Sequence, residues 1–177
     1  LLSDLLAAAT PLKGVIHLWN LDLAMGSTGG APFNHEAFLA GCGSMVQWIQ
    51  ALAKLAPEKN PPRFWLVTRA AQFVPGDTAM TCAAQAMAWG LGRSAGLEHP
   101  DLIGKQIDLS GVPLPDDASR VVDELFANDL QNMVALRQNG RFGLRLARVE
   151  TLEPTRNFSI NPNGAYLISR GLGGLGA

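Results

Sequence analysis

Short apolar runs, separated by longer amphipathic segments, are the feature that most restricts how this chain can fold. Three such runs are Gly14–Trp19, Arg63–Thr68 and Lys105–Leu109. Short runs rich in β-branched and aromatic side chains predict buried strands, and the segments between them are long enough for crossover helices. The alternation therefore predicts an α/β fold in which helices flank a mostly parallel sheet.

Two long helices are predicted between these strands. The first begins near Asn34 as its N-cap and runs to about Ala56, where Pro57 ends it. Its apolar residues recur at steps of four and three, which is typical of one buried helix face. They are Phe38, Cys42, Met45, Ile49 and Leu52.

The second long helix is predicted at Thr81–Glu98, before Pro100. It is rich in alanine and glycine, and each glycine inside a helix costs about 1 kcal/mol relative to alanine. We therefore expect this helix to pack closely against the sheet or against a partner.

A short helix and a hairpin are predicted after the third strand. Asp116 or Asp117 can cap a helix that extends through Phe126 and buries Val121, Val122, Leu125 and Phe126. The hairpin joins strands at Met133–Arg137 and Phe142–Val149 through the turn Asn139–Gly140. Alternation in its second strand predicts that Arg141 and Arg145 point outward and that Phe142, Leu144 and Leu146 face the core.

Composition excludes several classes of protein. Fourteen Lys and Arg against 15 Asp and Glu leave a net charge of -1, which gives no overall field for nucleic acid or an anionic membrane. The isolated Cys42 and Cys82 argue against a disulfide scaffold and a structural zinc site, so no metal is expected. No apolar run reaches the roughly 20 residues of a membrane span. The first residues lack the basic segment with which a signal peptide begins, so no signal peptide is expected. We therefore expect a cytoplasmic location.

The motif Gly171-x-Gly173-x-x-Gly176 follows a predicted strand at Ala165–Ser169, after a polar, turn-rich segment at residues 150–164. In dinucleotide folds such glycines form a tight turn and let the backbone approach a pyrophosphate. The helix and the charged residue that complete the motif are not in this sequence. A flexible glycine-rich tail is therefore the alternative interpretation. Both ends of the sequence suggest a piece of a longer protein.

Several segments, taken in chain order, give the sequence a recognisable pattern. They are Gly14–Trp19, Trp65–Arg69, Trp89–Arg93, Leu97–Pro100, Ile107–Leu109, Val134–Arg137, Arg145–Leu146 and Tyr166–Ile168, followed by the glycine motif. In these segments the chain resembles the ketoreductase region of modular polyketide synthases over nearly its whole length.

The resemblance implies a truncated Rossmann-like sheet of the short-chain dehydrogenase/reductase type. Residues 1–150 would form its structural subdomain, residues 151–164 a linker, and residues 165–177 the start of the catalytic subdomain. The family binds NADPH and reduces a β-ketoacyl group that an acyl carrier protein holds on phosphopantetheine. Expected partners are thus the catalytic subdomain, the acyl carrier protein and other synthase domains, with no nucleic acid and no membrane.

The resemblance also implies which residues lie at the site. The family's catalytic Tyr, Ser and Lys lie downstream of the glycine loop, so no catalytic residue is expected in this chain and the chain alone should be inactive. Tyr166 lacks a Lys four residues later and cannot replace the general acid. The expected NADPH-binding residues are Gly171, Leu172, Gly173, Gly174, Leu175 and Gly176, with Ser169 and Arg170 as further candidates.

One residue departs from the family's pattern. Arg170 stands where the family usually has glycine. Its side chain could crowd the turn and impair cofactor binding, or its guanidinium could point outward and pair with a phosphate. If binding is impaired, the parent region would be a redox-inactive scaffold. An independent dinucleotide-binding protein is a third hypothesis.

The remaining polar candidates have mainly structural interpretations. We expect His17, on a strand, and His99, beside a helix end, to be structural. The carboxylates Asp77, Asp116 and Asp117 are interpreted as helix-start or loop residues. Four arginines would form a basic strip that is either a solvated hairpin face or a contact for an acidic carrier protein: Arg137, Arg141, Arg145 and Arg148. Trp19, Trp48, Trp65 and Trp89 are expected in the core or against the missing half.

Overall fold

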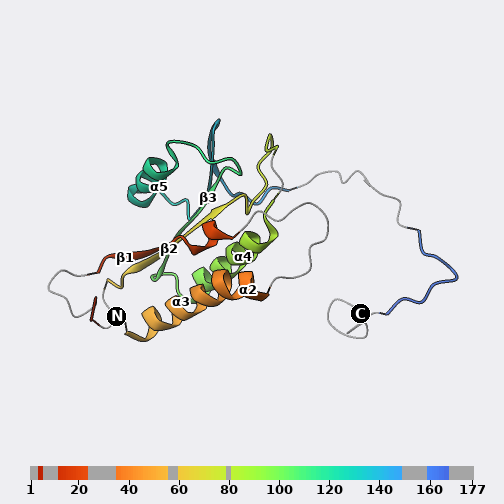
Figure 1. Ribbon diagram of the computed structural model, residues 1–177, viewed down its shortest axis with the longest axis horizontal. Helices are drawn as coiled ribbons and strands as arrows, with labels where there is room; N and C mark the ends of the chain where they lie inside the picture. Colours follow the sequence, from red (N-terminus) through yellow and green to blue (C-terminus); the bar gives the residue numbers. More distant parts are fainter. Residues whose placement is uncertain are drawn as a thin grey trace. The chain divides into compact units, whose positions relative to one another are not determined.

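The computed structural model describes residues 4–5, 12–23, 35–55, 60–78, 81–148 and 159–167 (Figure 1). The chain divides into two compact units, Leu1–Arg145 and Leu146–Ala177. A five-stranded sheet with the order β1-β2-β3-β4-β5 forms the frame of the first unit. Its strands are β1 (Gly14–His17), β2 (Arg63–Arg69), β3 (Ile103–Leu109), β4 (Met133–Arg137) and β5 (Gly140–Gly143).

The first four strands are parallel and β5 is antiparallel to β4, which confirms the predicted sheet. Helices cover both faces. On one face α3 (Ser44–Leu55) and α4 (Ala83–Glu98) pack over Phe64 and Leu66 of β2. On the other face α5 (Asp117–Phe126) packs over a cluster that includes Val67 of β2. Figure 1 shows α3 and α4 on one side of β2 and α5 on the other.

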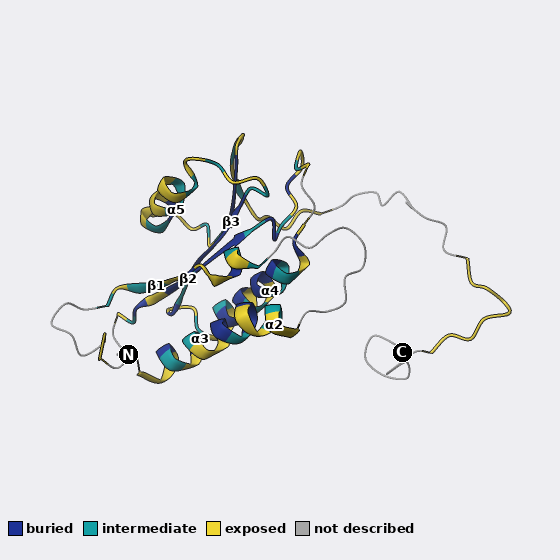
Figure 2. Cartoon of the chain, viewed as in Figure 1, coloured by how far each residue is buried: buried dark blue, intermediate teal, exposed yellow. Residues whose placement is uncertain are grey.

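The first predicted helix is present, but it is not uniform. It comprises α2 (His35–Phe38), a π-helical turn η2 (Leu39–Gly43) and α3, while Asn34, Ala56 and Pro57 lie outside the described residues. The predicted apolar face is confirmed, because Phe38 packs against the core and the other four members are buried (Figure 2). These are Cys42, Met45, Ile49 and Leu52.

The second predicted helix, α4, packs closely against the sheet. Only some of its small residues contribute to this packing. A Cβ added to Gly92 would lie 2.6 Å from Gln106 Oε1 of β3, so only glycine fits there without a shift. At Gly90, such a Cβ would have no atom of the described residues within 4 Å. The buried side of the helix consists of Gln85, Ala88, Trp89, Gly92 and Ala95.

The sequence predicted that the first strand is buried, but the structure shows a short strand that is only partly buried. β1 ends at His17 and forms an edge of the sheet, and Ile16 is 44% exposed. Trp19 lies in a following 3-10 turn, η1 (Trp19–Asp22), and is 55% exposed. An edge strand has a neighbour on one side only, so it is less buried than β2 and β3. Of the other tryptophans, Trp89 is buried, and Trp48 and Trp65 are half-buried.

The predicted buried face of α5 is only partly right. Val121 and Leu125 pack on the second core cluster, whereas Val122 and Phe126 are exposed. Residues 121 and 125 are four apart and lie one above the other, while 122 and 126 are rotated about 100° away from them. Glu124 is buried instead, because it lies against charged partners on the sheet.

The hairpin is confirmed, with two corrections. Its loop is Gln138–Asn139, one residue earlier than expected, and Gly140 pairs with Arg137 at φ +149°, a conformation that favours glycine. β5 ends at Gly143, so Leu144 and Leu146 are exposed rather than in the core. No described helix or strand covers them.

The second unit is described at residues 146–148 and 159–167 only, and all of these are exposed. Ala165–Leu167 form no strand, so the strand expected at Ala165–Ser169 is absent from its described part. Tyr166 Oη accepts a hydrogen bond of 2.7 Å from the Asn161 amide. Among the described residues, no helix has the length and hydrophobicity that crossing a membrane requires.

Candidate functional site

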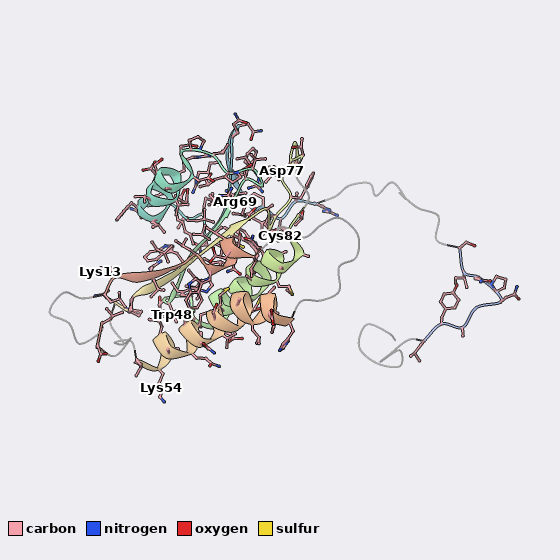
Figure 3. All side chains as sticks on the ribbon, in the orientation of Figure 1. Lys13, Trp48, Lys54, Arg69, Asp77 and Cys82 are labelled. Carbon is pink, nitrogen blue, oxygen red and sulfur yellow. The ribbon has the colours of Figure 1, made fainter. Side chains whose placement is uncertain are left out.

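The glycine loop that carries the cofactor prediction lies outside the described residues. This applies to Ser169, Arg170, Gly171, Leu172, Gly173, Gly174, Leu175 and Gly176. The described part of the chain does contain the other place where α/β folds bind ligands, the edge formed by the carboxyl ends of the parallel strands. Arg69, at the end of β2, and Asp77, in the loop that follows, lie near this edge (Figure 3).

Arg137, the last residue of β4, fills the centre of this edge. Its Nε donates to Asp77 Oδ1 at 2.9 Å, and its Nη2 donates to Asp108 Oδ2 at 2.9 Å and to the Gln72 carbonyl at 2.7 Å. Its Nη1 donates to the carbonyls of Asp108 and Leu136. Every nitrogen of the guanidinium therefore has a partner within the protein, and its side chain is 4% exposed.

Asp108 holds the loop that follows β2. Its Oδ1 accepts hydrogen bonds from Thr68 Oγ1 at 2.7 Å and from the Ala71 amide at 2.8 Å, and its Oδ2 accepts one from the Gln72 amide at 3.2 Å. The loop begins at Ala70, whose φ of +52° lies in the left-handed region. Such strain persists only where the surroundings impose it, and here Asp108 supplies that constraint.

A second arginine closes the neighbouring part of the edge. Arg69 Nη2 pairs with Asp117 Oδ2 at 2.7 Å, and Nη1 donates to the Ser110 carbonyl. Asp117 also accepts from the Leu114 amide at 3.1 Å, and it stands in the first turn of α5. Asp116 is the N-cap of this helix without making a side-chain cap bond, and lies 4.0 Å from Arg120.

This edge does not fit the pyrophosphate of a dinucleotide. A cavity of about 440 Å³ lies there, lined by Asp77, Ser110 and Arg137 among others. A pyrophosphate needs free N–H donors and positive charge, preferably at a helix N-terminus. Here the arginines are committed to carboxylates, and the first turn of α5 carries Asp117. The chemistry of this edge is that of a closed, self-paired structure.

A second charged cluster joins β3, α5 and β5. Lys105 Nζ lies 2.8 Å from Glu124 and 3.0 Å from Asp129, and Arg141 pairs with the same two carboxylates. Burial opposes the charged form of Glu124, but the hydrogen bonds from Arg141 and Lys105 outweigh it and hold the pKa of Glu124 below its ordinary value. The hydrogen bond to Glu124 likewise raises the pKa of Arg141.

The four arginines expected in one basic strip do not form one. Arg137 is buried in the sheet edge and Arg141 is paired with Glu124 and Asp129. Arg145 donates to Gln131 Oε1, and Arg148 is exposed. Alternation along a strand cannot show which arginine pairs with a carboxylate on another element. The predicted basic strip is therefore wrong.

His17 has the expected structural role. Asn20 Nδ2 donates to its Nδ1 at 3.2 Å, so its Nε2 carries the proton and donates to Ser44 Oγ at 2.8 Å. Ser44 Oγ in turn donates to the Gly41 carbonyl of the π-helical turn. Burial lowers the pKa of His17, which keeps the ring neutral. This chain of bonds joins β1 and η1 to the start of α3.

His99 lies at the end of α4, where its backbone amide donates to the Ala95 carbonyl. Sequence reasoning missed Asp108, Arg69 and the pairing of Asp77. A charged residue inside the apolar run Ile107–Leu109, and arginines at two strand ends, were the available signals. Within the described ranges, no group of three or more His, Cys, Asp and Glu side chains could hold a metal ion.

Comparison with known proteins gives a consistent result. Residues 5–146 match the family model described as "Polyketide synthase extender module SpnB, Rossmann fold domain". The chain is 33% identical over 177 residues to polyketide synthase GfsA of Streptomyces halstedii, covering 99% of this chain and 2% of that protein. It is 40% identical over 112 residues to erythronolide synthase EryA3 of Saccharopolyspora erythraea, covering 63% of this chain and 3% of that protein.

Ketoreductases are among the solved structures that match this chain. A C2-type ketoreductase from a modular polyketide synthase matches with a TM-score of 0.66 and 32% identity, covering 86% of this chain and 32% of that chain. A-type ketoreductases from a modular polyketide synthase match with a TM-score of 0.69 and 26% identity, covering 86% of this chain and 30% of that chain. The chain thus spans about a third of these ketoreductases and a few per cent of the synthases.

Proposed function

Because this chain belongs to the Rossmann fold domain family of polyketide synthase extender modules, we propose that it is mainly the non-catalytic half of a ketoreductase. The complete region would reduce the β-keto group of an intermediate held on the phosphopantetheine of an acyl carrier protein, with NADPH as reductant. It would act within a multifunctional synthase, next to other synthase domains. This chain alone would be inactive.

The observation that carries the proposal is the closed carboxyl edge of the sheet. Arg137 is fully bonded to Asp77, Asp108 and backbone carbonyls, so its guanidinium offers no free donor to a cofactor phosphate at this edge. We propose that NADPH binds instead at the glycine loop, residues 171–176, as the resemblance implies. The half that contains the sheet would then act by packing, which keeps the reacting groups of the other half in position.

The outward side of α3 and α4 is the surface on which we propose that the catalytic half packs. A groove of about 450 Å³ lies between the two helices, lined by Val46 and Ile49 of α3 and by Leu91 and Ser94 of α4. Leu97 of α4 is 87% exposed nearby. Gly90 of α4 has no side chain, and the described residues leave open space beside it, so the backbone of a partner could approach α4 closely at this position.

A bulky residue on α4 tests this proposal in the complete ketoreductase region. We expect Gly90→Trp to fold, since no described atom lies within 4 Å of its added Cβ, but to lower kcat/KM for a β-ketoacyl thioester at least tenfold. The matched control is Ala118→Trp, on the outer part of α5, with an unchanged rate. An unchanged rate in Gly90→Trp as well would contradict the packing role.

A redox-inactive scaffold is the alternative function, and Arg170 in the glycine loop favours it. The complete region should then gain NADPH affinity strongly on Arg170→Gly, as measured by fluorescence titration. If affinity is high beforehand and does not change, Arg170 is tolerated and the reductase proposal is supported.

A further inference from the structure

A separate cavity of about 220 Å³ lies beside α4 and is lined by residues of β4 and β5. Ala135 of β4 and Phe142 of β5 face each other across the strand pair and line it. Trp89 of α4 and Leu144, which follows β5, form further parts of its wall. The cavity is formed entirely within the first compact unit.

Trp89 has a buried donor for which the described residues provide no acceptor. The residue is 4% exposed, and its indole Nε1–H has no hydrogen-bond partner among the described residues. A buried donor left without an acceptor costs about 1–3 kcal/mol. A segment that entered the cavity with a carbonyl oxygen could remove this cost.

Two of the residues that line the cavity are apolar and exposed. Phe73 is 68% exposed and Leu144 is 50% exposed. The alternation Phe142, Leu144, Leu146 is the sequence pattern of a covered strand face, yet no described element covers Leu144 or Leu146. Exposed aromatic and aliphatic side chains around a concave site are typical of a protein interface.

We propose that this cavity receives an extended segment of the catalytic half of the same ketoreductase. An apolar side chain of that segment packs between Phe73 and Leu144, and a carbonyl oxygen accepts the hydrogen bond of Trp89 Nε1–H. This inference rests on the proposed function. It adds a second contact surface, distinct from the groove between α3 and α4.

The course of the chain favours this occupant. The first compact unit ends at Arg145, which itself lines the cavity. The chain covers 32% of a similar ketoreductase, so roughly two thirds of such a protein has no counterpart in this chain. The rest of the region is therefore covalently joined to this unit, and covalent attachment raises its effective concentration at the surfaces of the unit.

Photocrosslinking in the complete ketoreductase region tests the inference. Benzoylphenylalanine replaces Phe73 in one sample and Leu130, which is 95% exposed and does not line the cavity, in the control. We expect position 73, and not position 130, to link to a peptide of the catalytic half, as identified by mass spectrometry. A link to an added acyl carrier protein instead, or no link, would overturn the inference.

Hydrogen exchange of the indole groups gives a second readout in the same region. We expect Trp89 Nε1–H to exchange at least tenfold faster in the Leu144→Asp variant than in the wild type, while the half-buried Trp65 is unchanged. Equal exchange of Trp89 in both proteins would contradict the hydrogen bond. If these tests fail while Gly90→Trp still lowers the rate, only this inference is wrong and the proposed function stands.

Discussion

Asp108 and Arg137 form an ion pair inside the sheet, with 2.9 Å between Oδ2 and Nη2 and with side chains that are 0% and 4% exposed. Buried charges need both pairing and hydrogen bonds, and this pair has them from Thr68, the loop after β2 and Asp77. The pair occupies the edge at which related folds bind a ligand. The same interaction therefore stabilises the sheet and leaves the Arg137 guanidinium no free donor at this edge.

Asp108→Asn should destabilise the chain by about 3–5 kcal/mol, because it removes the fully buried counter-ion of Arg137 and leaves only the partly exposed Asp77. Urea unfolding followed by circular dichroism measures the change. Asp101→Asn, at an exposed position, is the matched control and should lie within about 0.5 kcal/mol of the wild type. A loss for Asp108→Asn as small as the control's would show that the pair is not needed for stability.

The folded chain should become more stable as the pH rises toward 7, in part through His17. Burial lowers the pKa of His17 below 6.5, so the unfolded chain takes up the proton at a higher pH than the folded chain. The stability from the neutral ring is therefore complete above about 6.5 and is lost as the pH falls below it.

His17→Gln should flatten this dependence between about pH 7 and the lowered pKa. Urea midpoints measured across that interval give the comparison, and His35→Gln, at an exposed helix position, serves as the control. A wild-type slope retained in His17→Gln would assign the dependence to another group.

A second pH dependence should come from Glu124. Its pKa is lowered because the bonds from Arg141 and Lys105 outweigh burial, so its contribution is complete above about 4.5 and is lost as the pH falls through the lowered value. Glu124→Gln should cost about 3 kcal/mol at pH 7, since it leaves the buried Lys105 with Asp129 alone. The difference from wild type should shrink near pH 3.

Denaturant midpoints from about pH 3 to 7 check this, with the exposed Glu98→Gln as the control. A difference from wild type that is constant over the whole range would indicate a packing effect of the substitution rather than the loss of an ion pair.

Local patterns in the sequence predicted much of the fold. The strands β2 and β3, the helix α4 and the apolar face from Phe38 to Leu52 follow from periodicity and from the positions of proline. Patterns on one element failed where a distant element decides the outcome. Glu124 is buried because it pairs with Lys105 of β3 and Arg141 of β5. These pairs help to determine which face of α5 lies against the sheet.

The candidate site was less predictable than the fold. The pairing of Arg137 with Asp77 and Asp108 joins residues up to 60 positions apart, which no spacing rule connects. Leu144 and Leu146 show a different failure. Their alternation predicted a buried face, but β5 ends at Gly143 and both side chains are exposed, so the pattern extended further along the chain than the strand does.

Contacts within the chain should require glycine at position 14 but not at position 90. A Cβ on Gly14 would lie 1.8 Å from Trp65 Cζ3 and 2.6 Å from the Arg63 carbonyl oxygen, and the backbone contact cannot be relieved by moving a side chain. Gly14→Ala should therefore cost about 1–3 kcal/mol. Gly90→Ala, inside α4 with open space around it, should instead stabilise the chain by about 0.5–1 kcal/mol. Urea unfolding of both variants measures the difference, and equal stabilities would show that β1 can move away from β2 without cost.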